Sequence, residues 1–446
     1  MFGQRRRTQG NNQATPNDIE NQNSSLEDSR GQELYQVSRV SPLRCIYRAP
    51  QRLRHAREEA YTPKLVSIGP LHHGKEDLLP MEEHKKRYLQ DFLGRSRLSL
   101  NNYILKIKAQ EERLRSCYME TIKFGSDDLA RIILVDAAFI IEVLLRCYHK
   151  DLIDENDCVF GKPILICDIW PDLLLLENQL PFFILEELSL YLELIENCKR
   201  TSMVFLSHNF FNDCFVMPIE GTKEENEEKI RSHQVEVKHL LDLLRTLLIL
   251  PIVLKSQDGQ HLGTFGTSST VTELQQAGIS FKVGAGRGLL AIQFTDGILE
   301  VPKLTLLYQT EVTIRNITAF EQCEFPSDVQ YVCHYVAILD CLVNTAMDVE
   351  LLVHYGIVEN NIGDSKNVSR LINSLGSGLM VDADYFYYST VCQNLNDHCS
   401  SRWNKTMANL RQNYFNTPWT TLSVVAAGIL LVLTFIQTVS SVISIA

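Results

Sequence analysis

The feature that most constrains this chain is an uncharged stretch near its C-terminus. Arg411 is the last charged side chain, and residues 421–439 read TLSVVAAGILLVLTFIQTV. About 20 apolar residues at 1.5 Å rise match the ~30 Å hydrocarbon core of a bilayer. The pattern therefore predicts one transmembrane helix at 420–442, and its terminal position is typical of a tail anchor.

The N-terminus lacks the pattern of a cleavable signal peptide, because no apolar segment follows Arg5–Arg7. We therefore expect a single-pass protein of the plasma membrane or endoplasmic reticulum, with its body facing the cytosol. Four N-x-[ST] sequons leave an extracellular or lumenal body open as an alternative, since they would then be glycan acceptors. They begin at Asn23, Asn316, Asn367 and Asn404.

The composition is globular, with 45% hydrophobic and 22% charged residues among 446. Residues 1–40 are polar and predict a disordered segment, followed by a helix-rich body over 41–411. The net charge of -11 argues against a nucleic-acid partner, because phosphate binding needs clustered basic residues. The basic runs 5–7 and 85–87 are interpreted as solvated surface.

The twelve cysteines show no spacing typical of a zinc site, and a cytosolic body would keep them as free, mostly buried thiols. The glycines at 284–288 match neither a P-loop nor a dinucleotide-binding loop. We therefore expect no metal and no cofactor.

Hydrophobic periodicity predicts a mainly helical body. Helices are expected over 81–93, 128–147, 172–188 with a kink or restart at Pro181, 239–250, and again within 328–375. In the second of these, Arg131, Glu142 and Arg146 are placed on the polar face. Between 278 and 324 the pattern changes to short strands, with a turn at Thr295-Asp296-Gly297. The predicted fold class is mainly α with a small antiparallel β insert (α+β), plus the C-terminal transmembrane helix.

Several ordered blocks resemble one plant family. Tyr61-Thr62-Pro63 followed by Ser67-Ile68-Gly69-Pro70-Leu71-His72-His73-Gly74 is similar to its most recognisable signature, and Ile46-Tyr47-Arg48-Ala49-Pro50 resembles its opening motif. The chain thus resembles, over residues 41–440, the family catalogued as domain of unknown function 247. The resemblance implies a plant protein with one C-terminal membrane helix, no established enzymatic activity and, in some grass members, a link to pollen recognition.

His72 and His73 are the most conspicuous candidate residues. Adjacent histidines can bind a metal or exchange protons near neutral pH. They can equally hydrogen-bond backbone carbonyls in a loop after Gly69-Pro70, and no metalloprotease pattern accompanies them. We retain them as candidates for an interaction surface.

Three polar residues lie in apolar helical patterns. Asp136 falls on the apolar face of its helix, which predicts a buried carboxylate paired with a cation, although catalytic use stays open. Glu177 and Asn178 interrupt a leucine run and either satisfy the backbone near Pro181 or bind a ligand. All three are interpreted as structural buried polar residues.

The patterns favour a membrane-tethered, non-enzymatic protein that binds other proteins. The family resemblance implies that it is a plant protein of interaction, signalling or recognition. An unknown protein partner and the membrane are the expected partners, and no catalytic residue is assigned. One alternative is a hydrolase-like enzyme with a site near His72 and His73. Another is a purely structural membrane tether.

Overall fold

The computed structural model describes residues 43–192, 202–213, 219–253, 269–284, 288–400 and 418–445. The expected disordered segment at 1–40 lies outside them. The chain divides into two units, Met1–Arg44 and Cys45–Ala446, and the architecture below is that of the second.

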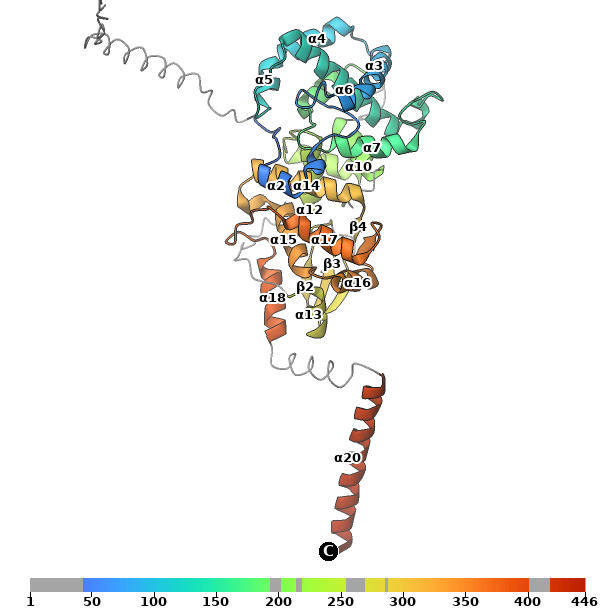
Figure 1. Cartoon of the computed structure of the whole chain (residues 1–446), viewed down its shortest axis with the longest axis vertical. Helices are drawn as coiled ribbons and strands as arrows, with labels where there is room; N and C mark the ends of the chain where they lie inside the picture. Colours follow the sequence, from blue (N-terminus) through green and yellow to red (C-terminus); the bar gives the residue numbers. More distant parts are fainter. Residues whose placement is uncertain are drawn as a thin grey trace, which may run out of the picture. The chain divides into compact units, whose positions relative to one another are not determined.

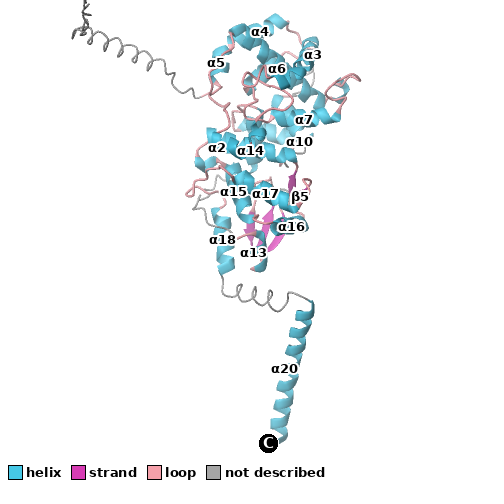
Figure 2. Cartoon of the chain, in the orientation of Figure 1, coloured by secondary structure: helices cyan, strands magenta, loops and turns pink. Residues whose placement is uncertain are grey.

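Short and long helices make up the first half of this unit (Figures 1 and 2). In chain order they are α2 (Gln51–Ala56), η1 (Glu58–Tyr61), η2 (Glu76–Leu78), α3 (Leu79–Gly94), α4 (Leu100–Ala109), α5 (Glu111–Ser116), α6 (Ser126–Tyr148), η3 (Lys150–Leu152), α7 (Pro163–Leu173), α8 (Phe182–Ser189), α10 (Met203–Asp213), α11 (Lys223–Ser232) and α12 (Leu240–Val253).

The second half combines helices with five short strands. They are α13 (Val271–Gln276), β1 (Ser280–Val283), β2 (Gln293–Thr295), β3 (Ile298–Val301), β4 (Leu304–Leu306), α14 (Tyr308–Glu324), η5 (Ser327–Val329), α15 (Tyr331–Leu342), α16 (Ala346–His354), β5 (Val358–Asn360), α17 (Ser365–Gly376), α18 (Ser389–Ser400) and α20 (Pro418–Ile445). Helix α14 packs against α7 and α12 of the first half and against α15, α17 and β4 of the second.

Helix α6 is the centre of the first half and confirms the prediction over 128–147. It packs against α3, α4, α8 and α10, so most of its surface is buried. The polar face was wrongly assigned, because Glu142 and Arg146 are buried and form an ion pair with each other. Arg95 adds a second cation 2.7 Å from Glu142, which compensates the buried carboxylate. Arg131 alone of that group is exposed.

The predicted helix over 172–188 is wrong in its middle. Helix α7 ends at Leu173 and α8 begins at Phe182, with Pro181 as its N-cap residue, so the chain restarts at the proline. Residues 174–181 form no helix. The reason is that the proline ring removes a backbone donor, while the side-chain amide of Gln179 donates to two backbone carbonyls of this segment.

The strands confirm one prediction and correct another. Strands β2 and β3 are antiparallel and joined by Asp296 and Gly297, with φ of 51° and 78°, as a type I′ turn requires. However, β1 pairs with β3 in parallel and β4 pairs with β5 in parallel, so the insert is not simply antiparallel. The second part of the predicted β insert, from Tyr308 to Glu324, forms helix α14 instead of strands.

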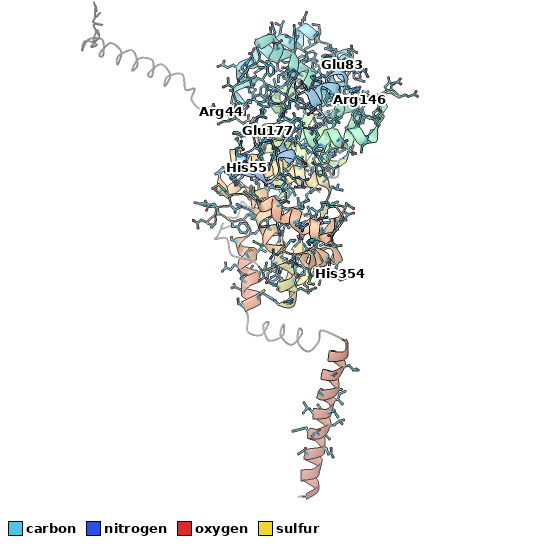
Figure 3. The ribbon with its side chains drawn as sticks, viewed as in Figure 1. Arg44, His55, Glu83, Arg146, Glu177 and His354 are labelled. Atoms are coloured by element: carbon cyan, nitrogen blue, oxygen red, sulfur yellow. The ribbon has the colours of Figure 1, made fainter. Side chains whose placement is uncertain are left out.

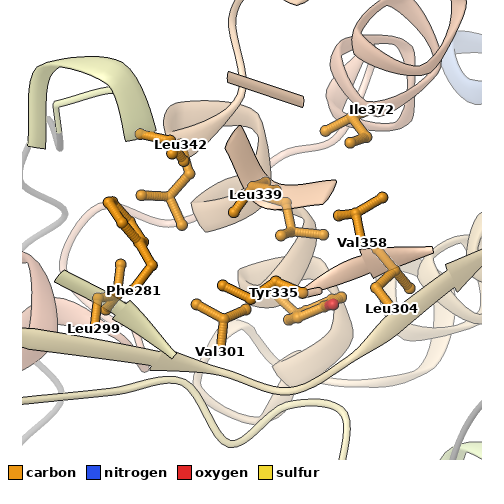
Figure 4. A pocket seen from close by; sticks show the side chains of 12 residues that line it. Phe281, Leu299, Val301, Leu304, Tyr335, Leu339, Leu342, Val358 and Ile372 are labelled. Atoms are coloured by element: carbon orange, nitrogen blue, oxygen red, sulfur yellow. The ribbon is translucent and has the colours of Figure 1, made fainter. Parts of the chain in front are cut away.

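The strands and α15 enclose an apolar core (Figure 4). Phe281, Leu299, Tyr335 and Leu339 surround a cavity of about 10 Å³. A volume this small holds one water molecule at most, and the walls are apolar. This part of the fold is therefore packed interior and offers no ligand site.

The structure contradicts the predicted transmembrane helix at 420–442. No helix among the described residues combines length and apolar character to the extent needed to cross a bilayer. Helix α20 forms over Pro418–Ile445. The tail anchor, the single-pass topology and the plasma-membrane or reticulum localisation that rested on this helix are corrected with it.

Candidate functional site

The candidate residues of the sequence meet around one segment, the buried loop 64–72. The loop has no regular secondary structure, and residues 66–70 are buried. Gly69 has φ +70° because it bends the chain beside Pro70. Backbone groups buried outside helices and strands need side-chain partners, since an unpaired buried N–H or C=O group is costly.

Asp172, at the end of α7, holds the beginning of the loop. Its Oδ2 atom accepts backbone N–H groups from Leu65 at 2.7 Å and Val66 at 2.9 Å, and its Oδ1 accepts that of Lys64 at 3.0 Å. Burial raises the pKa of Asp172 to about 6, although the three N–H donors oppose this change. The carboxylate therefore acts as a cap for a turn that no helix provides.

Asn178 holds the middle of the loop. Its Oδ1 accepts the Ile68 N–H at 2.8 Å, and its amide donates to the carbonyl of Val66 at 3.0 Å. A second amide hydrogen reaches the carbonyl of Asp172 at 2.9 Å. The first two bonds are of the kind that a neighbouring strand would provide, and among the residues that the structure describes the loop has no such strand beside it.

Asp136 on α6 and Lys85 on α3 hold the bend. The Gly69 N–H donates to Asp136 Oδ2 at 2.8 Å, and Lys85 Nζ donates to Asp136 Oδ1 at 2.5 Å and to the Ser67 carbonyl at 2.8 Å. Asp136 is 1% and Lys85 0% exposed, so this is a buried ion pair. The interpretation of residues 85–87 as solvated surface is therefore wrong for Lys85. Its spacing from Met81 and Tyr88, i+4 and i+3 on the buried face of α3, is the signal that would have identified it.

Glu177 holds the end of the loop, and Figure 3 labels it. It lies 3.2 Å from Nε2 of His72 and 2.8 Å from Nη1 of Arg48, and it also pairs with Arg54. Burial raises its pKa, but these donors and the Ala49 N–H outweigh burial and lower it to about 2. Burial lowers the pKa of His72, which is consistent with a neutral ring that donates to the carboxylate.

The two adjacent histidines do not form a site together. His72 is 2% exposed and faces Glu177, whereas the His73 ring lies edge-on to Phe124, with 5.6 Å between centroids. Within the described part of the chain, no three His, Cys, Asp or Glu side chains gather as metal ligands would. Asp136, Asn178, Glu177 and His72 are thus brought together as supports of one loop.

An open pocket lies where the loop begins, between η1, α7 and the start of α14. Its volume is about 240 Å³, and we call it the Tyr308 pocket after the aromatic side chain in its wall. Its polar lining residues are Glu59, Thr62, Lys64, Asp168, Asp172 and Gln309. Lys64 Nζ lies 4.6 Å from the centre of the Tyr308 ring and donates to its hydroxyl group. The pocket joins segments that are over 200 residues apart, so sequence patterns could not reveal it.

The sequence also did not reveal a contact between Cys158 and His84. Cys158 Sγ lies 2.8 Å from Nδ1 of His84, and both residues are partly exposed. The turn that carries the thiol is fixed by Asp157, whose carboxylate accepts a hydrogen bond from Tyr88 at 2.9 Å and lies 3.0 Å from Arg146. A thiol beside an imidazole is the usual arrangement of an activated cysteine.

Comparison with known proteins gives a consistent assignment. The UPF0481 protein At3g47200 of Arabidopsis thaliana is 29% identical over 426 residues, which cover 90% of this chain and 86% of that protein. The UPF0481 protein At3g02645 of the same plant is 23% identical over 484 residues and covers 90% of each chain. No solved structure matches. The family model described as plant protein of unknown function, DUF247, matches residues 46–433. The chain therefore belongs to the DUF247 family of plant proteins, whose function is unknown.

Proposed function

We propose that this protein is a non-catalytic recognition protein that binds a protein partner through the Tyr308 pocket and its rim. The supporting observation is the use of the buried polar residues. The side chains of Asp172, Asn178 and Asp136 accept backbone N–H groups of the buried loop 64–72. Glu177 is engaged by His72 of the loop and also by the Ala49 N–H, Arg48 and Arg54. A catalytic acid or base instead needs access to a substrate proton.

The same bonds make the pocket a preformed surface. The loop contributes Lys64 and Leu65 to the pocket wall, and both backbone N–H groups are held by Asp172. A surface that is rigid before binding loses less conformational entropy when a partner docks. The acidic net charge of -11 favours protein over nucleic acid as that partner.

The test reverses charge at the pocket rim. Glu59 and Asp168 are exposed and, within the described residues, have no side-chain partner, so Glu59→Lys with Asp168→Lys should leave the fold intact. Glu350→Lys with Asp397→Lys is the matched control on α16 and α18, where both acids are exposed.

The full-length protein and both variants would be used to capture partners from plant extract. We expect at least one protein that binds the wild type and the control but not the pocket variant. If both variants retain the same bound proteins as the wild type, or if the wild type retains none above a bait-free resin, the proposal fails.

A thiol-dependent enzyme is the second candidate, favoured by the 2.8 Å contact between Cys158 and His84. If His84 activates the thiol, Cys158 should react with iodoacetamide faster than Cys167, an exposed cysteine of the same chain. His84→Ala should remove the difference. Equal rates at Cys158 and Cys167, measured by mass spectrometry of the peptides, would exclude an activated cysteine here.

A further inference from the structure

We propose that the Tyr308 pocket binds an organic cation, a guanidinium or ammonium group on an alkyl stem. This inference rests on the proposed function because it names the chemistry recognised at the same site. The pocket holds about 240 Å³, which leaves room for several water molecules. That space suits one long side chain or a small amine.

The charges in the lining favour a cation. Glu59, Asp168 and Asp172 contribute three carboxyl groups, and Lys64 contributes one ammonium group. Asp172 is 3% exposed and is held by three backbone N–H groups, so its position is fixed before a ligand arrives. A concave site with fixed negative charge raises the local concentration of cations.

The remaining walls suit the stem of such a ligand. Pro171, Leu175 and Val312 supply apolar surface, and the residue Tyr308 is 38% exposed. Lysine and arginine bury their methylene stems along apolar surface and place the charged head on polar or aromatic groups. The pocket offers both kinds of surface.

Lys64 occupies part of the position that an incoming cation would take. Its ammonium group lies 4.6 Å from the centre of the Tyr308 ring and lines the same pocket as Glu59 and Asp168. Arg57, 5.6 Å from the ring centre, is paired with Glu311 at 2.6 Å, a carboxylate that it shares with Arg315. Removing the Lys64 charge should therefore strengthen cation binding, whereas an anion would lose its main anchor. The sign of the effect separates the two classes of ligand.

The experiment is isothermal titration calorimetry with the full-length protein. The probes are the peptide acetyl-Gly-Arg-Gly-amide, its neutral citrulline analogue, and agmatine as a free cation. We expect saturable binding of the arginine peptide or agmatine and none of the citrulline peptide. Tighter binding of the peptide would indicate a partner protein as the source of the cation, and tighter binding of agmatine a small metabolite.

Two variants and a control locate the binding. Glu59→Gln with Asp168→Asn should weaken it about tenfold, and Lys64→Met should strengthen it roughly two- to fivefold, since each charge acts near the surface. Glu350→Gln with Asp397→Asn should change nothing. Absence of binding at millimolar probe, equal binding of arginine and citrulline, an unchanged pocket variant, or weaker binding by Lys64→Met would each overturn the inference.

The cation-binding experiment and the partner-capture experiment can fail independently of each other. If the charge-reversed pocket loses a captured protein but no cation binds, recognition stands and the cationic chemistry is wrong. If the cation binds but the captured proteins are unchanged, the pocket is a ligand site and does not dock a protein.

Discussion

Asp136→Ala is expected to destabilise the protein by about 3–5 kcal/mol, the usual cost of breaking a buried ion pair by removing one partner. Lys85 would lose its 2.5 Å contact while remaining 0% exposed. It would keep Glu82 at 2.6 Å and the Ser67 carbonyl at 2.8 Å, which limits the loss. The Gly69 N–H would lose its acceptor within the buried loop, which adds about 1–3 kcal/mol if no water reaches it.

A compensating variant tests whether the pair is the cause. Asp136→Leu with Lys85→Met removes both charges and keeps apolar volume, so it should be less destabilised than Asp136→Ala. The unpaired Gly69 N–H should prevent full recovery. Asp128→Ala, an exposed acid in the first turn of the same helix, should cost below about 1 kcal/mol.

Equilibrium unfolding in urea gives these free energies, and the fluorescence of Trp170, buried on α7, reports on the region. If Asp136→Ala unfolds within about 1 kcal/mol of the wild type, the buried pair is not a net support of the loop. The same conclusion follows if the double variant is as unstable as the single one.

Three further predictions concern the same loop and its neighbours. The pKa of Glu177 is lowered from 4.5 to about 2, so the unfolded chain binds the proton first as the pH falls. About 3 kcal/mol of stability should be present above pH 4.5 and be lost towards pH 2, and Glu177→Gln should flatten this dependence in pH-resolved unfolding. Gly69→Ala should cost about 2 kcal/mol or more in a urea titration, because its Cβ would lie 2.8 Å from the Gln179 carbonyl at positive φ. Gly74→Ala, also at positive φ but with open space around it, should cost only about 1–2 kcal/mol, and equal losses would contradict the clash. Asn316→Ala should lower stability by about 2–4 kcal/mol, since the side chain donates to the Ala60 carbonyl and accepts the Leu176 N–H, and an unchanged melting temperature would refute this.

Asn316 also bears on the alternative of a glycosylated body. Its side chain is 0% exposed and engaged in hydrogen bonds on α14, so the folded protein cannot present it to a glycosylating enzyme. Asn367, at the start of α17, is exposed. A glycan on Asn367 and none on Asn316 is the pattern expected if the body meets that machinery after folding.

The sequence by itself determined the local elements and the family. Apolar spacing located α3 and α6, Pro181 located the restart at α8, and Asp296-Gly297 located the hairpin. These features depend on residues a few positions apart, because helical periodicity and turn chemistry are local properties. The ordered motifs along residues 41–440, with the clearest at 46–74, likewise indicated the family that the family model confirms over 46–433.

Only the tertiary structure decided what the polar residues do. The parallel pairing of β4 with β5 joins Leu304 to Val358, and the supports of the buried loop 64–72 lie 18 to 112 positions from the groups they hold. Which buried donor meets which acceptor depends on how the helices pack, and a linear pattern does not carry that information. Lys85 is an example. Its basic neighbours in the sequence suggested an exposed side chain, whereas the Asp136 carboxylate on α6 compensates its buried charge across the helix interface.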